Sequence, residues 1–99
     1  MVAKNTENIE WIDGLSMALA HPKTFKIPPA ELLATIKPGS TVKVGVQPER
    51  FWVIVTKVID SKISGVVDND LIYTHIHGLD FDDNVEFEMR NVLDILEQE

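Results

Sequence analysis

Two histidines separated by a single residue are the first candidates for chemistry in this sequence. His75 and His77 stand in the stretch "THIHG", and a β-strand there would point both imidazoles to the same face. Imidazole nitrogens are common zinc ligands, but a zinc site needs three or four protein ligands. The nearby carboxylates of Asp80, Asp82 and Asp83 could complete the set. The alternative interpretation is two partly exposed histidines on a sheet edge, with no metal.

The stretch "DFDDNVE" also has the beginning of a calcium-binding pattern. Asp80, Asp82 and Asn84 occupy alternate positions, as the first oxygen ligands of an EF-hand loop do. That loop then requires glycine at its sixth position and glutamate at its twelfth. This chain has Val85 and Asn91 at those two positions. The sequence therefore excludes an EF-hand.

The familiar sequence motifs of enzymes are absent. There is no G-x-S-x-G elbow, no phosphate-binding glycine loop and no dinucleotide fingerprint, and each of the five glycines is isolated. The chain has no cysteine, which excludes disulfides, thiol catalysis and thiolate zinc sites. We therefore expect no catalytic residue and no cofactor, and a binding protein rather than an enzyme.

The formal net charge of −7 is unevenly distributed along the chain. Residues 67–99 carry ten acidic groups against Arg90 alone, whereas residues 31–66 carry a net charge of +2. An acidic surface repels phosphate backbones, so nucleic-acid binding is disfavoured. Such a surface either maintains solubility or meets a basic protein partner, and the two oppositely charged parts also allow a homodimer. The candidate acidic contacts are Asp80, Asp82, Asp83, Glu86 and Glu88.

The stretch "ERFWVIV" places two aromatic residues side by side, so a strand there would point them to opposite faces. No polar residue follows at alternate positions until Thr56, so we expect both faces to be covered, the second partly by N-terminal helices. We expect Phe51 in the core. Trp52 either packs in a second apolar layer or, left partly open beside Glu49 and Arg50, forms a partner-binding hot spot.

The N-terminal part of the chain, residues 6–36, is predicted to be helical. Apolar residues recur near helical spacing over residues 6–20, and Thr6 is suited to cap that helix. Pro22 then breaks the pattern. A second short helix is predicted in "PPAELLATI", because proline suits the first helical position.

Residues 41–90 are predicted to be β-rich. Strands are expected in "TVKVGV", in "RFWVIVTKVID" and, after a hairpin turn, in "ISGVVDN". In "NVEFEMR" the alternation points Val85, Phe87 and Met89 inward. "LIYTHI" is compatible with a short strand or an irregular segment, and the tail "NVLDILEQE" with a closing helical turn. The predicted fold is a single α+β domain over residues 1–99. Its sheet is expected to be small, antiparallel and strongly bent, or an SH3-like barrel, with one or two N-terminal helices.

The order of several short motifs from residue 39 to residue 96 resembles an uncharacterised bacterial family, the domain-of-unknown-function family 2314. The motifs are Gly39, Lys43-Val44, Glu49 to Val53, Ile63-Ser64-Gly65, Val67-Asp68-Asn69, Val85-Glu86-Phe87 and Val92 to Leu96. Two features differ: Asp83-Asn84 stands where the family has Gly-Asp, and the family's closing tryptophan is absent. The resemblance implies a small β-rich domain and no established activity.

The first ten residues lack the pattern of a secretory signal, and no apolar stretch approaches the roughly 20 residues of a membrane span. We therefore expect a cytoplasmic protein without membrane contact. The function that the sequence favours is a non-enzymatic protein-binding module, such as an adaptor, an inhibitor or an immunity-type protein, that uses its acidic C-terminal surface. The alternative is a metal-binding or metal-dependent site built on His75 and His77.

Overall fold

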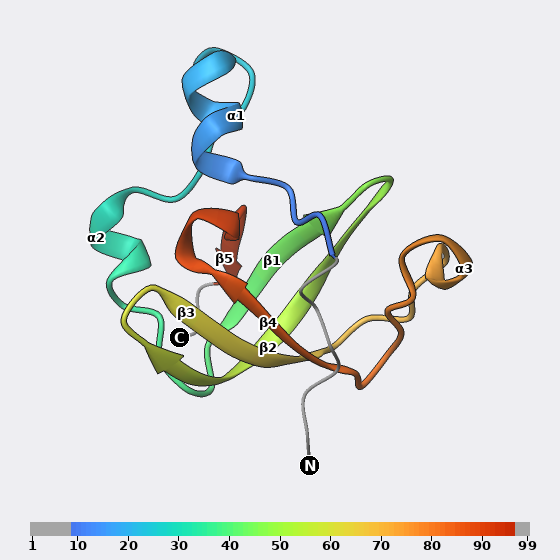
Figure 1. The fold of residues 1–99 in the computed structure, drawn as a ribbon. Helices are drawn as coiled ribbons and strands as arrows, with labels where there is room; N and C mark the ends of the chain where they lie inside the picture. The colour runs from blue at the N-terminus through green and yellow to red at the C-terminus, as the bar shows by residue number, and fades with distance from the viewer. Residues whose placement is uncertain (1–8, 97–99) are drawn as a thin grey trace.

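The computed structural model describes residues 9–96 as a five-stranded sheet with short helices at its periphery (Figure 1). The α+β prediction is confirmed. In chain order the elements are α1 (Gly14–Ala20), α2 (Ala30–Leu33), β1 (Thr41–Val46), β2 (Glu49–Ile59), β3 (Lys62–Val67), α3 (Thr74–His77), β4 (Asn84–Glu88), the 3₁₀ turn η1 (Met89–Asn91) and β5 (Asp94–Leu96). No helix in this part of the chain is long and apolar enough to cross a membrane.

The strands form one antiparallel sheet in the order β4-β3-β2-β1-β5. Strands β1 to β4 pair with their neighbours in sequence, and β5 returns to pair with β1. Because β4 and β5 lie at opposite ends of this order and do not pair with each other, the sheet is not closed into a barrel. A bulge at Val55/Lys57 interrupts the β2–β3 register, and bulges bend the strand that carries them.

One face of the sheet forms the core, as the alternation of the strand sequences predicts. Phe51 is 1% exposed, which confirms its expected place. Trp11 joins this core: it forms a bridge with Val46, and its ring lies 5.4 Å from that of Phe87. The buried side chains of the sheet are Val42, Val44, Val46, Phe51, Val53, Val55, Ile63, Val67, Val85 and Phe87.

The predicted helix over residues 6–20 begins later than expected. Within the described chain it is α1, and Asp13 is its N-cap, with Oδ1 accepting the Ser16 N–H at 3.0 Å. The predicted cap, Thr6, lies outside the described residues. Residues 11–13 are extended because the Ile12 N–H donates to the Gly45 carbonyl at 2.8 Å, which continues the edge of β1. Tertiary pairing has therefore overridden the helical spacing of this segment.

The predicted second helix is reduced to the four residues of α2, with Pro29 at the N-cap rather than inside the helix.

The expectation that both faces of β2 are covered is wrong. Ile54 is 38% exposed, Thr56 is exposed and Trp52 is half-buried on the outer face. From residue 9 onward, the N-terminal segment covers one end of that face, where the Ile12 side chain fills the space beside Gly45. An apolar strand face is thus left partly open to solvent.

The C-terminal part differs from the prediction in two ways. Met89 does not extend β4 but begins η1, and the expected helical turn in the tail is the strand β5. Strand β5 pairs with β1 through Thr41 and Leu96, and the Leu93 N–H donates to the Lys43 carbonyl at 2.8 Å. The tail is extended because β1 has a free edge with which it pairs. The local sequence of the tail does not encode that edge.

Candidate functional site

The connection from β3 to β4, residues 68–83, is the longest segment without strand structure between two strands of the sheet; we call it the 68–83 loop. It contains five aspartates, no lysine and no arginine, and its regular structure is the single turn α3. Loops longer than about 12–15 residues in compact domains are usually functional or disordered. This one is held in place by side chains of the sheet, which favours a functional loop.

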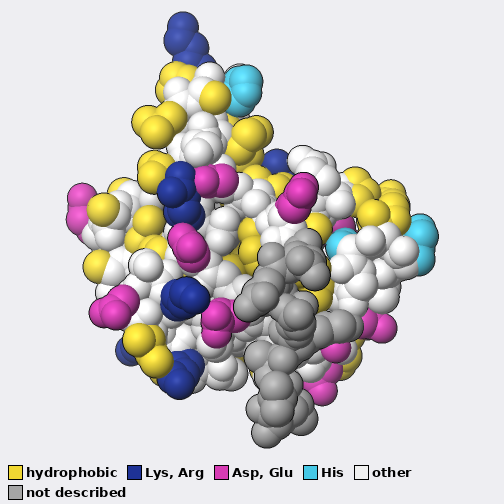
Figure 2. Space-filling model, viewed as in Figure 1, with side chains coloured by type: hydrophobic (Ala, Val, Ile, Leu, Met, Phe, Trp, Pro, Cys, Tyr) yellow, Lys and Arg dark blue, Asp and Glu magenta, His cyan; other side chains and the backbone are white. Residues whose placement is uncertain are grey.

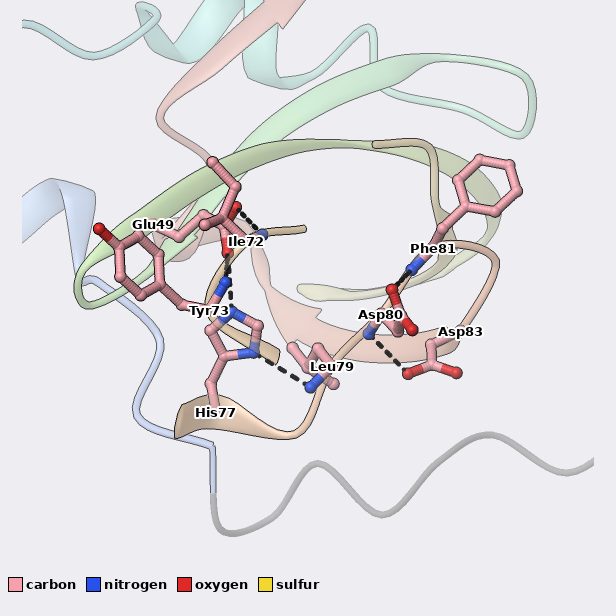
Figure 3. Close-up of polar contacts among 8 residues, drawn as sticks. All are labelled: Glu49, Ile72, Tyr73, His77, Leu79, Asp80, Phe81 and Asp83. Atoms are coloured by element: carbon pink, nitrogen blue, oxygen red, sulfur yellow. Dashed lines mark hydrogen bonds and ion pairs between the residues drawn. The ribbon is translucent and has the colours of Figure 1, made fainter. Parts of the chain in front are cut away.

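Glu49, the first residue of β2, fixes the loop to the sheet (Figure 3). Its Oε2 accepts the Ile72 N–H at 2.9 Å, and its Oε1 accepts the Tyr73 N–H at 3.2 Å. The same Oε1 lies 3.0 Å from Nε2 of His77. The side chains of Glu49 and His77 are only 10% and 2% exposed, so this pair is shielded from water.

Both ring nitrogens of His77 are occupied. Nδ1 accepts the Leu79 N–H at 3.0 Å, so this nitrogen carries no hydrogen. The ring hydrogen therefore sits on Nε2 and is donated to the Glu49 carboxylate. In this arrangement the imidazole is neutral, and it links the sheet to the C-terminal end of α3.

The environment of Glu49 keeps it ionised. Burial alone would raise the pKa of this carboxyl group. The hydrogen bonds from His77, Ile72 and Tyr73 lower the pKa, and together they outweigh the effect of burial. The net result is a pKa below the ordinary value of 4.5. A carboxylate with these partners is an anchor for the loop, and its oxygens are directed at the protein rather than at solvent.

The structure does not give the two histidines the geometry predicted for a metal site. A strand at "THIHG", which would have placed both imidazoles on one face, does not form, because residues 74–77 are the helix α3. Residues two apart on a helix point about 200° away from each other. Accordingly His75 is exposed while His77 is buried against Glu49. Over residues 9–96, no three His, Cys, Asp or Glu side chains are grouped to hold a metal ion.

The aspartates after α3 shape a turn. Asp80 Oδ1 accepts the Phe81 N–H at 2.8 Å, and Asp83 Oδ2 accepts the Asp80 N–H at 2.9 Å. Asp82 has a φ of 69°, a conformation that aspartate tolerates better than most residues. The predicted acidic residues 80, 82 and 83 are therefore brought together, but by local turn bonds.

The outer surface of the 68–83 loop combines exposed hydrophobic side chains with carboxylates. Ile72 is 76% exposed and Ile76 is 59% exposed, and Phe81 is exposed as well. Figure 2 shows hydrophobic side chains gathered at the end of the molecule that carries α3, with acidic side chains beneath them. The exposed aspartates of the loop are Asp68, Asp70, Asp80 and Asp82. These hydrophobic residues were not among the predicted contacts, because the sequence "LIYTHI" does not indicate which of its side chains face water.

The predicted contact residues Arg50 and Trp52 are held by other contacts within the chain. Trp52 is half-buried, and Lys43 Nζ lies 4.9 Å from the centroid of its ring. Its backbone N–H donates to Oδ1 of Asn69, in the 68–83 loop, at 2.6 Å. The Arg50 guanidinium lies 5.4 Å from the ring centroid of Phe25. Each residue thus has an intramolecular contact that accounts for its position.

The two predicted glutamates of β4 likewise have intramolecular roles. Glu86 lies 3.7 Å from Lys62 on the surface, and the Glu88 side chain forms a capping box with Asn91 at η1.

No family model, no curated protein and no solved structure matches this chain. The resemblance to the uncharacterised bacterial family 2314 therefore remains a prediction.

Proposed function

We propose that this protein is a non-enzymatic protein-binding module whose contact surface is the 68–83 loop. The observation that carries the proposal is that Glu49 holds the backbone of Ile72 and Tyr73 to the sheet while Ile72 and Ile76 stay exposed. A loop that is ordered before binding loses less conformational entropy when a partner docks. Exposed aliphatic side chains on such a loop provide apolar area to bury, which is the common driving force of association.

The chemistry of the loop selects the partner. The same loop presents exposed isoleucines and exposed aspartates, so the matching surface combines apolar side chains with lysine or arginine. This is the basic protein partner expected of an adaptor, inhibitor or immunity-type protein. We further propose that the protein acts in the cytoplasm, and that its sheet, with β5 returning to β1, is an opened relative of the SH3-like barrel.

The proposal is tested by affinity capture from lysate of the native host at low and moderate salt. The loop variant replaces both exposed residues, Ile72→Glu with Ile76→Glu. The control is Ile59→Glu, which changes an isoleucine that is 54% exposed at the end of β2, and Figure 1 shows the β2–β3 hairpin away from α3. Wild type and control should capture the same protein, less strongly at moderate salt, and the loop variant should lose it. Equal capture by the loop variant, with folding confirmed by circular dichroism, would contradict the proposal.

A further inference from the structure

The helix α1 is an apolar element that the rest of the described chain leaves largely uncovered. Its sequence "GLSMALA" has no charged residue, and Leu15 and Leu19 are 42% and 74% exposed. Figure 1 shows α1 standing away from the sheet, and Figure 2 shows hydrophobic side chains on both sides of this protrusion. We call residues 14–26 the α1 arm.

The α1 arm is nevertheless well defined by its own hydrogen bonds. Asp13 caps its start, and the His21 and Phe25 N–H groups donate to the Met17 and His21 carbonyls at 2.9 and 2.8 Å. At its base, Arg90 forms an ion pair with Asp13 at 2.7 Å. A seven-residue helix is too short to be stable in water by itself. An ordered, exposed and apolar helix of this kind is a candidate contact surface.

The charge of the arm is opposite to that of the 68–83 loop. Residues 14–26 contain Lys23 and Lys26, both exposed, and no acidic residue. The loop contains five aspartates, no lysine and no arginine. Each surface also presents exposed aliphatic side chains, Leu15 and Leu19 on the arm, Ile72 and Ile76 on the loop. The two surfaces therefore match in both charge and hydrophobicity.

Within one molecule the two surfaces are separated. Both contact the start of β2, the arm through Phe25 beside Arg50 and the loop through Glu49. Figure 1 nevertheless shows α1 and α3 standing apart, so α1 does not reach α3 of its own chain. We propose that the occupant of the α1 arm is the 68–83 loop of a second copy of this chain, in a two-fold dimer with two identical arm–loop contacts. A two-fold arrangement closes after two copies, whereas a one-sided contact would continue into a filament. This inference rests on the proposed function, since it takes the loop as a contact surface and names one partner for it.

Sedimentation equilibrium on the full chain tests the dimer with a pair of charge reversals. The arm-reversed variant is Lys23→Glu with Lys26→Glu, and the loop-reversed variant is Asp68→Lys with Asp70→Lys. Each variant alone should dimerise at least about tenfold more weakly than wild type, because like charges then face each other in both contacts. An equimolar mixture should recover a heterodimer, because both of its contacts again join opposite charges.

The control is Lys57→Glu with Lys62→Glu, which changes the net charge as the arm-reversed variant does but lies in the β2–β3 hairpin region. It should dimerise as wild type does. A wild-type chain that is monomeric at about 1 mM in low salt overturns the proposal. Reversed variants that dimerise as well as wild type, or a mixture that does not associate, overturn it too. A monomeric wild type whose capture of a host protein depends on Ile72 and Ile76 would remove the dimer and leave the proposed function standing.

Discussion

Glu49 and His77 meet across 28 positions of sequence, with Oε1 of the carboxylate 3.0 Å from Nε2 of the imidazole. This pair and the two backbone N–H groups on the same carboxylate join the start of β2 to α3. The contact explains why "LIYTHI" is not a strand, since the N–H groups of Ile72 and Tyr73 are taken by a side chain instead of a neighbouring strand. It also makes Glu49 the residue on which the shape of the 68–83 loop depends.

Replacing Glu49 by glutamine should destabilise the protein. An amide group has one acceptor oxygen, so it cannot accept from Ile72, Tyr73 and His77 together, and at least one of these donors loses its partner. A hydrogen bond to a charged group contributes about 1.5–3 kcal/mol, so losing one should cost about that much. Urea unfolding should show that loss in the free energy of unfolding, and hydrogen exchange should show faster exchange at the amides of residues 72, 73 and 79.

The control for this change is Glu31→Gln, on the exposed surface of α2. It should alter the free energy of unfolding by less than about 0.5 kcal/mol, as exposed substitutions usually do. If Glu49→Gln is as stable as this control and the loop amides exchange as in wild type, Glu49 is not the anchor of the loop.

The stability of the protein should fall in acid through the same carboxylate. A carboxyl group with a lower pKa in the folded state than in the unfolded state stabilises the fold at pH above its unfolded value. For Glu49 this stabilisation is present at pH values above the ordinary pKa of 4.5. It is lost as the pH falls through the lower pKa that Glu49 has in the folded protein. Asp13, whose pKa is lowered by the Ser16 N–H and by Arg90, acts in the same direction from an ordinary value of 3.8.

Urea unfolding from pH 7 to pH 3 measures this dependence. Above pH 5, Glu49 should contribute little to any change in the free energy of unfolding of the wild type, and below pH 4.5 that free energy should fall. In the Glu49→Gln variant the free energy of unfolding should fall less over the same pH interval. Parallel curves for the two proteins would show that Glu49 has the same pKa folded and unfolded.

Strands β1 to β4 were predictable from sequence because each has one buried face. Alternation in "TVKVGV" and "NVEFE" assigns Val42, Val44, Val85 and Phe87 to the core without any knowledge of their partners. The segments that were predicted wrongly have conformations set by distant groups. The tail is extended because β1 offers it a free edge, and residues 11–13 are extended because they continue that edge.

The candidate site was predictable only in its composition. The aspartates and the two histidines are visible in the sequence, and so is the excess of negative charge in the last third of the chain. Their roles depend on which of them face Glu49 and which face water. The local sequence pattern does not show which residues face water, because it does not decide between a strand and a helical turn at "THIH". A strand would place the two histidines on one face, and a helical turn places them on opposite sides.

Gly65 should be intolerant of any side chain. It lies on the core face of β3, paired with Val55 and Val85, and a Cβ atom there would lie 2.6 Å from the Ile54 carbonyl oxygen and clash with Val53. Backbone has little freedom to move, so Gly65→Ala should cost about 1–3 kcal/mol or more of unfolding free energy.

Gly45→Ala is the matched control for this position. Its new methyl group would meet Ile12 Cδ1 at 2.6 Å, but that atom is the end of a flexible side chain and is able to rotate away. Thermal unfolding should therefore rank the variants as wild type, Gly45→Ala and Gly65→Ala in decreasing stability. The reverse order of the two variants would show that the β2–β3 contact is not tight.

Zinc should distinguish the two histidines of the predicted metal site. His75 is exposed, whereas both nitrogens of His77 are engaged, by Glu49 and by the Leu79 N–H. A metal ion could reach His77 only by displacing one of these partners, which would release the loop. In an NMR titration with zinc chloride the His77 ring signals should keep their position while those of His75 shift, if any do. A concerted shift of both rings, accompanied by the amide signals of residues 72 and 73, would instead show that metal binding rebuilds the 68–83 loop around the two imidazoles.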